Sequence, residues 1–469
     1  MPFKPVLLWT DALIFLLLAA VLLFVRYVRR REHLHAPWQR VMGSRVGMAS
    51  SIVLAVYLAV GLMDSLHFQL PLPSQNGKTQ SVYDVEVLSV LDYIATPLRE
   101  HVEKTYSAPF ATHLYAKETI PLPGGGTVRD YPRLQYGGAH LADPLRDRAG
   151  DIAARTAWAL LGALALWVLA AVLLTRRLAR RQGVSPAAAW HSLWRREQAV
   201  PWHVALLTLG VLLLFLVPAA ALSVKYHIFG TDKVGLDVFY LSLKSIRTGL
   251  VIGTLTTLVM LPFALLLGIM AGYFRGWVDD LIQYLYTTLN SIPGVLLIAA
   301  SVLMMQVWME SRPELFDTVL ARADMRLLFL CIILGVTSWT GLCRLLRGET
   351  LKLREMEYIQ AAQAFGIGHG RIIARHILPN VMHIVLITVV MDFSGLVLAE
   401  AVLSYVGVGV DPSMQSWGNM INSARLEMAR EPVVWWSLAA AFLFMFVLVL
   451  CANLFADAVR DAFDPRTRR

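Results

Sequence analysis

The chain has 469 residues, of which 57% are hydrophobic and only 16% are charged. Soluble domains carry about a quarter charged residues, so this composition excludes an ordinary soluble protein. The net charge of +9 comes mostly from arginines beside apolar stretches, a pattern that marks cytoplasmic loops of membrane proteins rather than a nucleic-acid surface. We therefore expect an all-α polytopic membrane protein.

Nine stretches of the chain are apolar over about 20 residues, the length that crosses the hydrocarbon core of a bilayer. Arginines cluster after the first and third stretches, at residues 26–31 and 176–181. Because basic residues collect in cytoplasmic loops, this pattern predicts an outside N-terminus and a cytoplasmic C-terminus. The stretches lie at about 6–25, 46–66, 153–174, 202–224, 249–273, 286–307, 326–345, 381–404 and 433–454.

A polar insert with Pro and Gly punctuation separates the second and third stretches. We expect it to form a small ordered extracytoplasmic lobe with some helix at about 83–104. Its histidines, His101, His113 and His140, are not at metal-ligand spacing, so solvated loop histidines are favoured over a metal site. The predicted organisation is two N-terminal membrane helices in 1–66, the lobe in 67–151, a third helix with a basic cytoplasmic linker in 152–200, and a membrane core in 201–469.

The segment 354–380, between two apolar stretches, combines helix formers with closely spaced glycines. Residues 360–364 favour helix, and three glycines interrupt it between 366 and 370. A second amphipathic piece, 371–378, follows and stops before Pro379. The pattern predicts two short helices joined at a glycine elbow on the membrane surface, where a soluble partner could press.

Helix-breaking and acidic residues mark candidate pathway or gating positions inside the apolar stretches. Pro293 and Gly294 interrupt the sixth stretch, and such a pair kinks or unwinds a membrane helix. Asp392 and Glu400 lie in the eighth stretch, where a carboxylate is costly unless it faces a partner or a water-filled cavity. Pore-facing and helix-pairing roles are both open for Asp392, whereas no chain of titratable residues lines up with it for a proton relay.

Two loops expected outside the cytoplasm contain turn and interface signals. Glycines there permit tight turns, aspartates cap following helices, and Trp is common at membrane interfaces. These residues are candidates either for docking an extracytoplasmic partner or for ordinary capped turns. They are Gly230, Thr231, Asp232, Gly235, Asp237, Trp417 and Gly418.

The 354–380 segment resembles the cytoplasmic coupling loop of bacterial ABC importer permeases, whose pattern is Glu-Ala-Ala, three residues, Gly, and a later Ile-x-Leu-Pro. The matching residues are Ala361, Ala362, Gly366, Leu378 and Pro379, with Gln360 in place of the Glu and His376 where Ile is common. The segments 227–238 and 412–418 are also similar to those of the dipeptide and oligopeptide permeases. On these motifs the chain is identified as a C-type subunit of that binding-protein-dependent family, with an extended N-terminus.

The resemblance implies a type I importer core of six membrane helices, preceded by three more, in the bacterial cytoplasmic membrane. It implies a permease subunit that moves peptides or similar small solutes into the cell. The implied partners are two ATP-binding subunits, a second homologous permease, an extracytoplasmic solute-binding protein and membrane lipid, without nucleic acid. The implied ATPase-coupling residues are Gln360, Ala361, Ala362, Gly366, Gly368, Leu378 and Pro379.

No enzyme activity is expected of this chain itself. The sequence has no Gly-x-x-x-x-Gly-Lys-Ser/Thr phosphate loop, because the glycine-rich 366–370 segment lacks the Lys. We therefore expect no catalytic residue, no metal and no cofactor on this chain, with ATP and Mg bound by the partner ATPases.

Two other functions stay open at this point. An ion-driven secondary transporter or channel would use Asp392, Glu400 and the broken sixth stretch, although the coupling-loop pattern argues against it. A non-transporting membrane scaffold would use the lobe in 67–151 to bind a partner. The sequence also leaves open whether the solute is a peptide, a metal chelate or an antibiotic.

Overall fold

The computed structural model describes residues 3–30, 32–71, 83–121, 127–195, 198, 200–316 and 318–463. Parts of the expected lobe, residues 72–82 and 122–126, lie outside the described residues. The chain divides into two compact units, each built from non-contiguous segments. Unit 1 comprises Met1–Leu7, Trp38–Thr248 and Gln415–Leu454, and unit 2 comprises Leu8–Pro37, Gly249–Met414 and Phe455–Arg469. The domain boundaries predicted above stay predictions.

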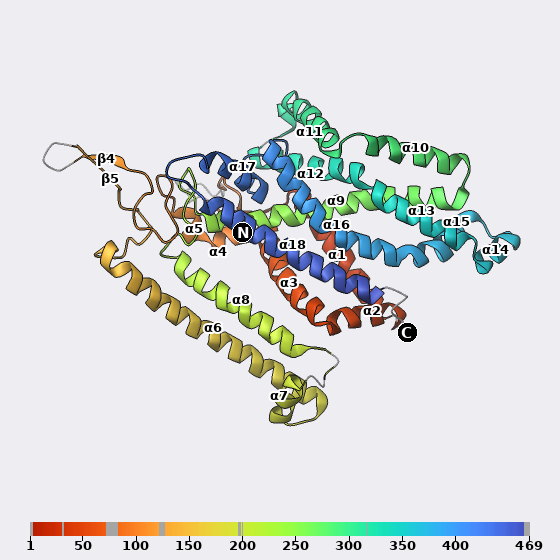
Figure 1. Cartoon of the computed structure of the whole chain (residues 1–469), viewed down its shortest axis with the longest axis horizontal. Coiled ribbons are helices and arrows are strands. Elements are labelled where there is room, and N and C mark those ends of the chain that lie inside the picture. Colours follow the sequence, from red (N-terminus) through yellow and green to blue (C-terminus); the bar gives the residue numbers. More distant parts are fainter. Residues whose placement is uncertain are drawn as a thin grey trace, which may run out of the picture. The chain divides into compact units, whose positions relative to one another are not determined.

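Unit 1 contains a long helical hairpin, in which α6 (Pro144–Gln182) and α8 (Trp202–Ser223) run side by side (Figure 1). Asp143 caps the start of α6 by accepting the backbone N–H groups of Leu145 and Arg146, and Gly183 ends the helix with φ +67°. Trp167 of α6 donates its indole N–H to the carbonyl of Leu206 on α8, 2.8 Å away. The helices of unit 1 include α3 (Arg45–Ser65), α6 (Pro144–Gln182), α7 (Pro186–Trp194), α8 (Trp202–Ser223) and α17 (Trp417–Glu427).

The expected lobe is ordered over its described residues, but it contains little helix. The predicted helix at 83–104 is reduced to two short pieces, because Ser89 and Asp92 form a capping box that starts one and Pro97 stands at the beginning of the next. A three-stranded antiparallel sheet pairs the lobe with the N-terminus in the order β1-β2-β3. The elements are β1 (Lys4–Val6), β2 (His67–Gln69), β3 (Leu88–Ser89), α4 (Val90–Ile94), α5 (Thr96–Glu100), β4 (Glu118–Pro121) and β5 (Thr127–Asp130).

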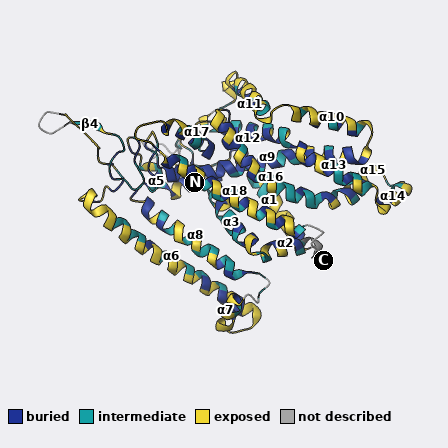
Figure 2. Ribbon diagram, in the orientation of Figure 1, coloured by how far each residue is buried: buried dark blue, intermediate teal, exposed yellow. Residues whose placement is uncertain are grey.

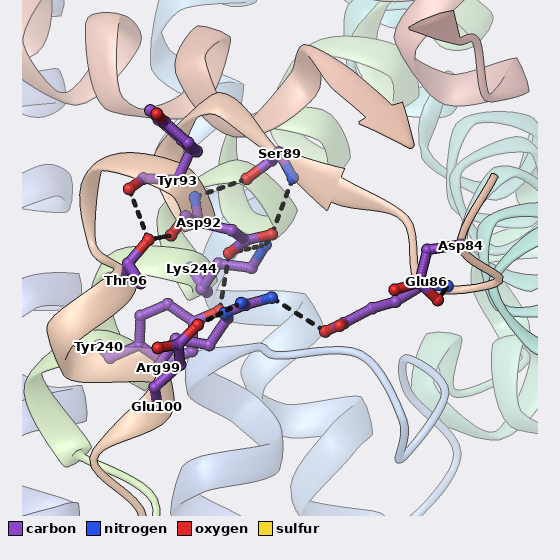
Figure 3. A network of polar contacts seen from close by, with 10 residues as sticks. All are labelled: Asp84, Glu86, Ser89, Asp92, Tyr93, Thr96, Arg99, Glu100, Tyr240 and Lys244. Carbon is purple, nitrogen blue, oxygen red and sulfur yellow. Dashed lines mark hydrogen bonds and ion pairs between the residues drawn. The ribbon is translucent and has the colours of Figure 1, made fainter. Parts of the chain in front are cut away.

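A buried ionic network fastens the lobe to the helix that follows the fourth apolar stretch (Figure 3). The Nζ of Lys244 lies 2.6 Å from the carboxylate of Asp64 and 2.9 Å from that of Asp92. Asp92 also accepts the hydroxyl of Tyr240 at 2.6 Å, and Asp64 accepts the hydroxyl of Ser89 at 2.7 Å. The network therefore joins α3, the lobe and the start of α9 (Val238–Phe274) within unit 1.

Unit 2 packs its helices around two apolar clusters. Glycines permit close contact between α9 and its neighbours, since a Cβ on Gly268 or Gly272 would lie under 3 Å from the backbone of α13 (Thr340–Arg354). Gly335 of α12 meets α9 in the same way, because a Cβ there would lie 2.6 Å from Val259. The helices of unit 2 include α1 (Trp9–Arg29), α10 (Trp277–Ser291), α11 (Gly294–Glu310), α12 (Val319–Ser338), α13 (Thr340–Arg354), α14 (Glu357–Ala364), α15 (His369–Ile372) and α16 (Leu378–Val406). Residues of α2 (Glu32–Gly43), α9 and α18 (Trp436–Phe463) belong to both units.

Among the described residues, seven helices are long and apolar enough to cross a membrane, and the bent pair α10 and α11 raises the number to eight at most. The expected number was about nine. The difference falls on the stretch at 326–345, which spans the junction of α12 and α13 instead of one apolar helix. Three charged residues stand near the start of α12, at Arg322, Asp324 and Arg326. The prediction of an all-α polytopic membrane fold is confirmed. Exposed residues recur along most of α6 (Figure 2).

The sixth expected stretch is divided into two helices at the Pro293–Gly294 pair. The helices α10 and α11 are bent by 87° at a break after Ser291. Ile292 is extended there, with φ −90° and ψ 130°, because a residue that precedes proline is disfavoured in the helical region. Pro293 and Gly294 therefore mark a sharp corner.

Candidate functional site

The glycine elbow of the 354–380 segment is a complete helix-ending motif. The N–H of Gly366 donates to the carbonyl of Gln363, and the N–H of Ile367 donates to that of Ala362. These two bonds form a Schellman motif, which requires a left-handed residue at its turn. Gly366 supplies it with φ +73°. Ala362 is buried and Ile367 packs against the same cluster, so an apolar contact closes the turn.

The elbow divides the predicted coupling residues into an exposed face and an anchored face. Ala362 is buried and Leu378 is half-buried, so these two hold the segment to unit 2. Phe365, at the end of α14, is 85% exposed beside the turn, although no sequence pattern singled it out. Large exposed aromatic side chains are typical anchors of protein interfaces. The exposed members of the predicted set are Gln360, Ala361, Gly366, Gly368 and Pro379.

The piece after the elbow does not stop before Pro379, contrary to the prediction. α15 continues through a π-helical turn, Ile373–Ile377, into α16, so that helix runs unbroken from His369 to Val406. The π-turn is wider than an α-turn, and Leu378 accordingly donates to the carbonyl of Ile373, five residues earlier. Pro379 lies inside this continuous helix, directly after the π-turn, whose wider backbone accommodates the proline.

Polar contacts hold the elbow against the end of α9. The hydroxyl of Tyr273 lies 2.8 Å from Nδ1 of His369 and also accepts the amide of Gln363 at 3.4 Å. A cavity of about 380 Å³ remains between this end of α9 and the residues Gln363 to His369. Nearby, Arg347 of α13 makes a bidentate ion pair with Asp279 of α10, at 2.5 and 2.7 Å. Polar contacts with α9 therefore hold the exposed face of the elbow in place.

The two intramembrane carboxylates lie in different surroundings. Asp392 lines a cavity of about 770 Å³ in unit 2, together with residues of α9, α13 and α16. Glu400 does not line this cavity; its side chain is buried and accepts the hydroxyl of Ser404 at 2.7 Å. Of the four predicted pathway residues, Asp392 lines this cavity, and Pro293, Gly294 and Glu400 are not among the residues that line it.

The turn residues predicted in the loop before α9 are buried against the lobe. Thr231 is fully buried, and its hydroxyl donates to the carbonyl of Thr105 at 2.8 Å. Asp232 accepts the backbone N–H groups of Val234 and Leu236 within its own turn. Asp237 caps α9 by accepting the backbone N–H groups of Phe239 and Tyr240. Gly235 has φ +79°, and a Cβ there would lie 1.8 Å from the carbonyl oxygen of Glu103. Gly230 is likewise left-handed, with φ +69°.

Trp417 and Gly418 are also buried in unit 1. Trp417 is only 2% exposed, and its indole N–H donates to the carbonyl of Ser242 at 3.2 Å. Both segments predicted as docking loops or turns therefore pack inside unit 1, which favours the turn interpretation for these side chains.

A buried histidine links the lobe to the same turn. Nδ1 of His227 lies 2.7 Å from the carboxylate of Asp237, and its Nε2 lies 3.4 Å from that of Glu103. Burial alone would lower the pKa of His227, but the contacts with Asp237 and Glu103 outweigh it and raise the pKa to about 9. Glu103 also accepts the backbone N–H groups of Gln135, Tyr136 and Gly137. Against the effect of burial, these bonds and His227 lower the pKa of Glu103 to about 2.

Lobe stability is expected to fall as the pH rises from about 6.5 to about 9. The pKa of His227 lies above its ordinary value of 6.5, so its contribution to the free energy of unfolding is complete below that pH and is lost through about pH 9. Glu103 contributes above about pH 4.5 and stays ionised over this range. The measurement is the thermal midpoint in detergent from pH 6 to 9.5.

His227→Gln should flatten this pH profile, and His113→Gln should leave it as it is in the unmodified chain. The control histidine contacts only Thr112 through its side chain among the hydrogen bonds described in the lobe. An identical profile in the unmodified chain and in His227→Gln would contradict the assignment.

Comparison with known protein families matches the part of the chain that carries the elbow and Asp392. The model of the family described as binding-protein-dependent transport system inner membrane component matches residues 264–469. The chain is similar to the glutathione transport system permease protein GsiD of Pectobacterium atrosepticum, with 30% identity over 326 residues, 64% of this chain and 99% of that protein. It is similar to the oligopeptide transport system permease protein OppC of Haemophilus influenzae, with 30% identity over 53% of this chain and 74% of that protein. OppC of Mycobacterium tuberculosis is 31% identical over 52% of this chain and 77% of that protein.

Proposed function

The chain belongs to the family of inner membrane components of binding-protein-dependent transport systems, and from this premise we propose that it carries peptides or similar small solutes into the cell. It is a multi-pass inner membrane protein and a permease subunit of an ABC importer, not an ATP-hydrolysing enzyme. The relatives reported above are named as permeases for oligopeptides or glutathione, which supports a peptide-like solute here.

Membership of the family implies ATPase and substrate-binding partners. In our proposal these are two ATP-binding subunits, a second homologous permease and an extracytoplasmic solute-binding protein. ATP and Mg bind on the ATPase subunits, and this chain contributes no cofactor. The N-terminus lies outside and the C-terminus in the cytoplasm, as the arginine clusters at 26–31 and 176–181 favour. The lobe then faces the side from which solute arrives.

The observation that carries the proposal is the exposed elbow, with Phe365 and Gly366 at its tip and Ala362 anchored beneath. When ATP closes the ATPase pair, the elbow moves with it. Because α15, the π-turn and α16 form one continuous helix, this motion passes from the elbow to Asp392 without an intervening hinge loop. The same helix thus connects the surface where energy enters with the cavity in unit 2.

A pull-down from native membranes in mild detergent tests the proposal. We expect the tagged chain to recover an ATPase and a second permease, identified by mass spectrometry, together with ATP hydrolysis. Phe365→Ala should reduce recovery of the ATPase at least about tenfold, because truncating an interface anchor costs about 2 kcal/mol or more. Tyr131→Ala, an exposed aromatic of the lobe, serves as the control that keeps recovery unchanged.

Recovery of this chain without any ATPase, at unchanged yield, would contradict the proposal and favour the ion-driven alternative. In that case the cavity at Asp392 would have to act without an energy-coupling partner.

A further inference from the structure

Unit 2 contains a cavity lined by residues of α9, α12, α13 and α16. Its volume of about 770 Å³ falls within the range of about 300–1,000 Å³ that is typical of small-molecule sites. Its wall contains residues without large side chains, such as Gly341, Gly395 and Ala399, beside apolar ones such as Met260. Two charged side chains, Asp392 and Arg344, complete the lining.

Asp392 stands midway along α16, an apolar helix of membrane-spanning length. A carboxylate at such a depth is costly unless it faces a partner or a water-filled space. Within the described part of the chain, no hydrogen bond or ion pair joins its side chain to another residue. The charge of Asp392 is therefore left facing the cavity.

Arg344 presents the opposite charge from α13. Its side chain is exposed, and its guanidinium lies 6.0 Å from the ring centre of Tyr286. Among the described residues no carboxylate pairs with it, and it makes no ion pair with Asp392. An unpaired guanidinium is the side chain best suited to bind a carboxylate through two parallel hydrogen bonds.

We propose that this cavity binds the two charged ends of a zwitterionic solute: the Asp392 carboxylate binds an ammonium group, and the Arg344 guanidinium binds a carboxylate. The inference rests on the proposed transport function and narrows its solute to short peptides with free termini. A solute that lacks either terminal charge leaves one of the two side chains uncompensated. The cavity therefore selects for both ends at once.

The test uses the complete importer, with its partner permease, ATPases and binding protein, in proteoliposomes. Uptake is measured for trialanine and for its N-acetylated and C-amidated forms. Asp392→Asn should lower the ratio of free to N-acetylated uptake at least about tenfold, because a hydrogen bond to a charged group corresponds to about that factor. Arg344→Gln should lower the ratio of free to C-amidated uptake by a similar factor. Each variant should leave the other ratio unchanged.

Comparing the uptake ratios of variant and unmodified importers reports the effect of the substitution in this chain alone. The preference of the binding protein is the same in every sample and therefore cancels. Glu314→Gln removes an exposed carboxylate of unit 2 outside the cavity and should keep both ratios. Asp392→Glu retains the charge and should restore most of the discrimination lost in Asp392→Asn.

A second measurement does not depend on the charged variants. Ser338 lines the cavity, and a cysteine placed there, with the native cysteines replaced by alanine, reports access to a maleimide. Free trialanine should slow its labelling, and the blocked forms should slow it much less. Unchanged uptake ratios in the variants, or equal slowing of the labelling by all three solutes, would overturn the inference. Uptake of trialanine by the unmodified importer would in that case still support the proposed function. Failure of the unmodified importer to take up any of the three would overturn both.

Discussion

Gly366→Trp is expected to abolish uptake in the assembled importer while leaving the chain folded. The left-handed φ of +73° costs any L-residue about 1–2 kcal/mol, so the Schellman turn is weakened. No atom lies within 4 Å of the position that a Cβ would occupy, so the indole does not disturb the core and projects from the exposed face instead. The readouts are solute uptake and ATP hydrolysis in proteoliposomes, where hydrolysis should lose its dependence on loaded binding protein.

Two further variants separate backbone strain from bulk. Gly366→Asn tolerates the left-handed conformation and should retain most of the uptake. Gly150→Trp adds the same indole on α6, where a Cβ also meets open space, and should leave uptake unchanged. Normal uptake by Gly366→Trp would show that the elbow does not transmit the motion of an ATPase.

The elbow shows how far local sequence determines this site. Helix formers before Gly366 predict α14, and the glycine predicts its end, because both effects act within one turn. The unbroken helix from His369 to Val406 was not predicted, since Pro379 normally ends or kinks a helix. The π-turn before Pro379 lets the helix continue through the proline, and this turn is held by the packing of Ile372 and Ile377 in the apolar cluster.

Exposure was the other property that the sequence did not reveal. Phe365 and Trp417 are both aromatic residues beside glycines, yet one is 85% exposed and the other 2%. The difference arises from contacts with distant residues, such as the bond from Trp417 to the carbonyl of Ser242. Seven of the nine predicted membrane-spanning stretches coincide with helices that are long and apolar enough to cross a membrane, because such stretches depend on length and composition.

Lys244 shows the same dependence on distant contacts, and its removal should strongly destabilise unit 1. Its ammonium lies between Asp64 and Asp92, which are 180 and 152 positions away in the sequence. The side chains of the two aspartates are 4% and 7% exposed, so Lys244→Met leaves two buried carboxylates without a cation. Breaking such a pair costs about 3–5 kcal/mol. The measurement is the thermal midpoint in detergent, together with the protease resistance of the lobe.

Lys104→Met is the matched control, because its ion pair with Glu118 is on the surface and its side chain is 71% exposed. An exposed pair contributes about 1 kcal/mol or less, so this variant should keep the midpoint. Adding Asp92→Asn to Lys244→Met removes one of the stranded charges and should recover part of the loss. If Lys244→Met unfolds like the unmodified chain, the network does not hold the lobe. If Lys244→Met unfolds at a lower temperature and the added Asp92→Asn recovers part of the loss, the ion pairs of Lys244 fasten α3 and the lobe to the start of α9.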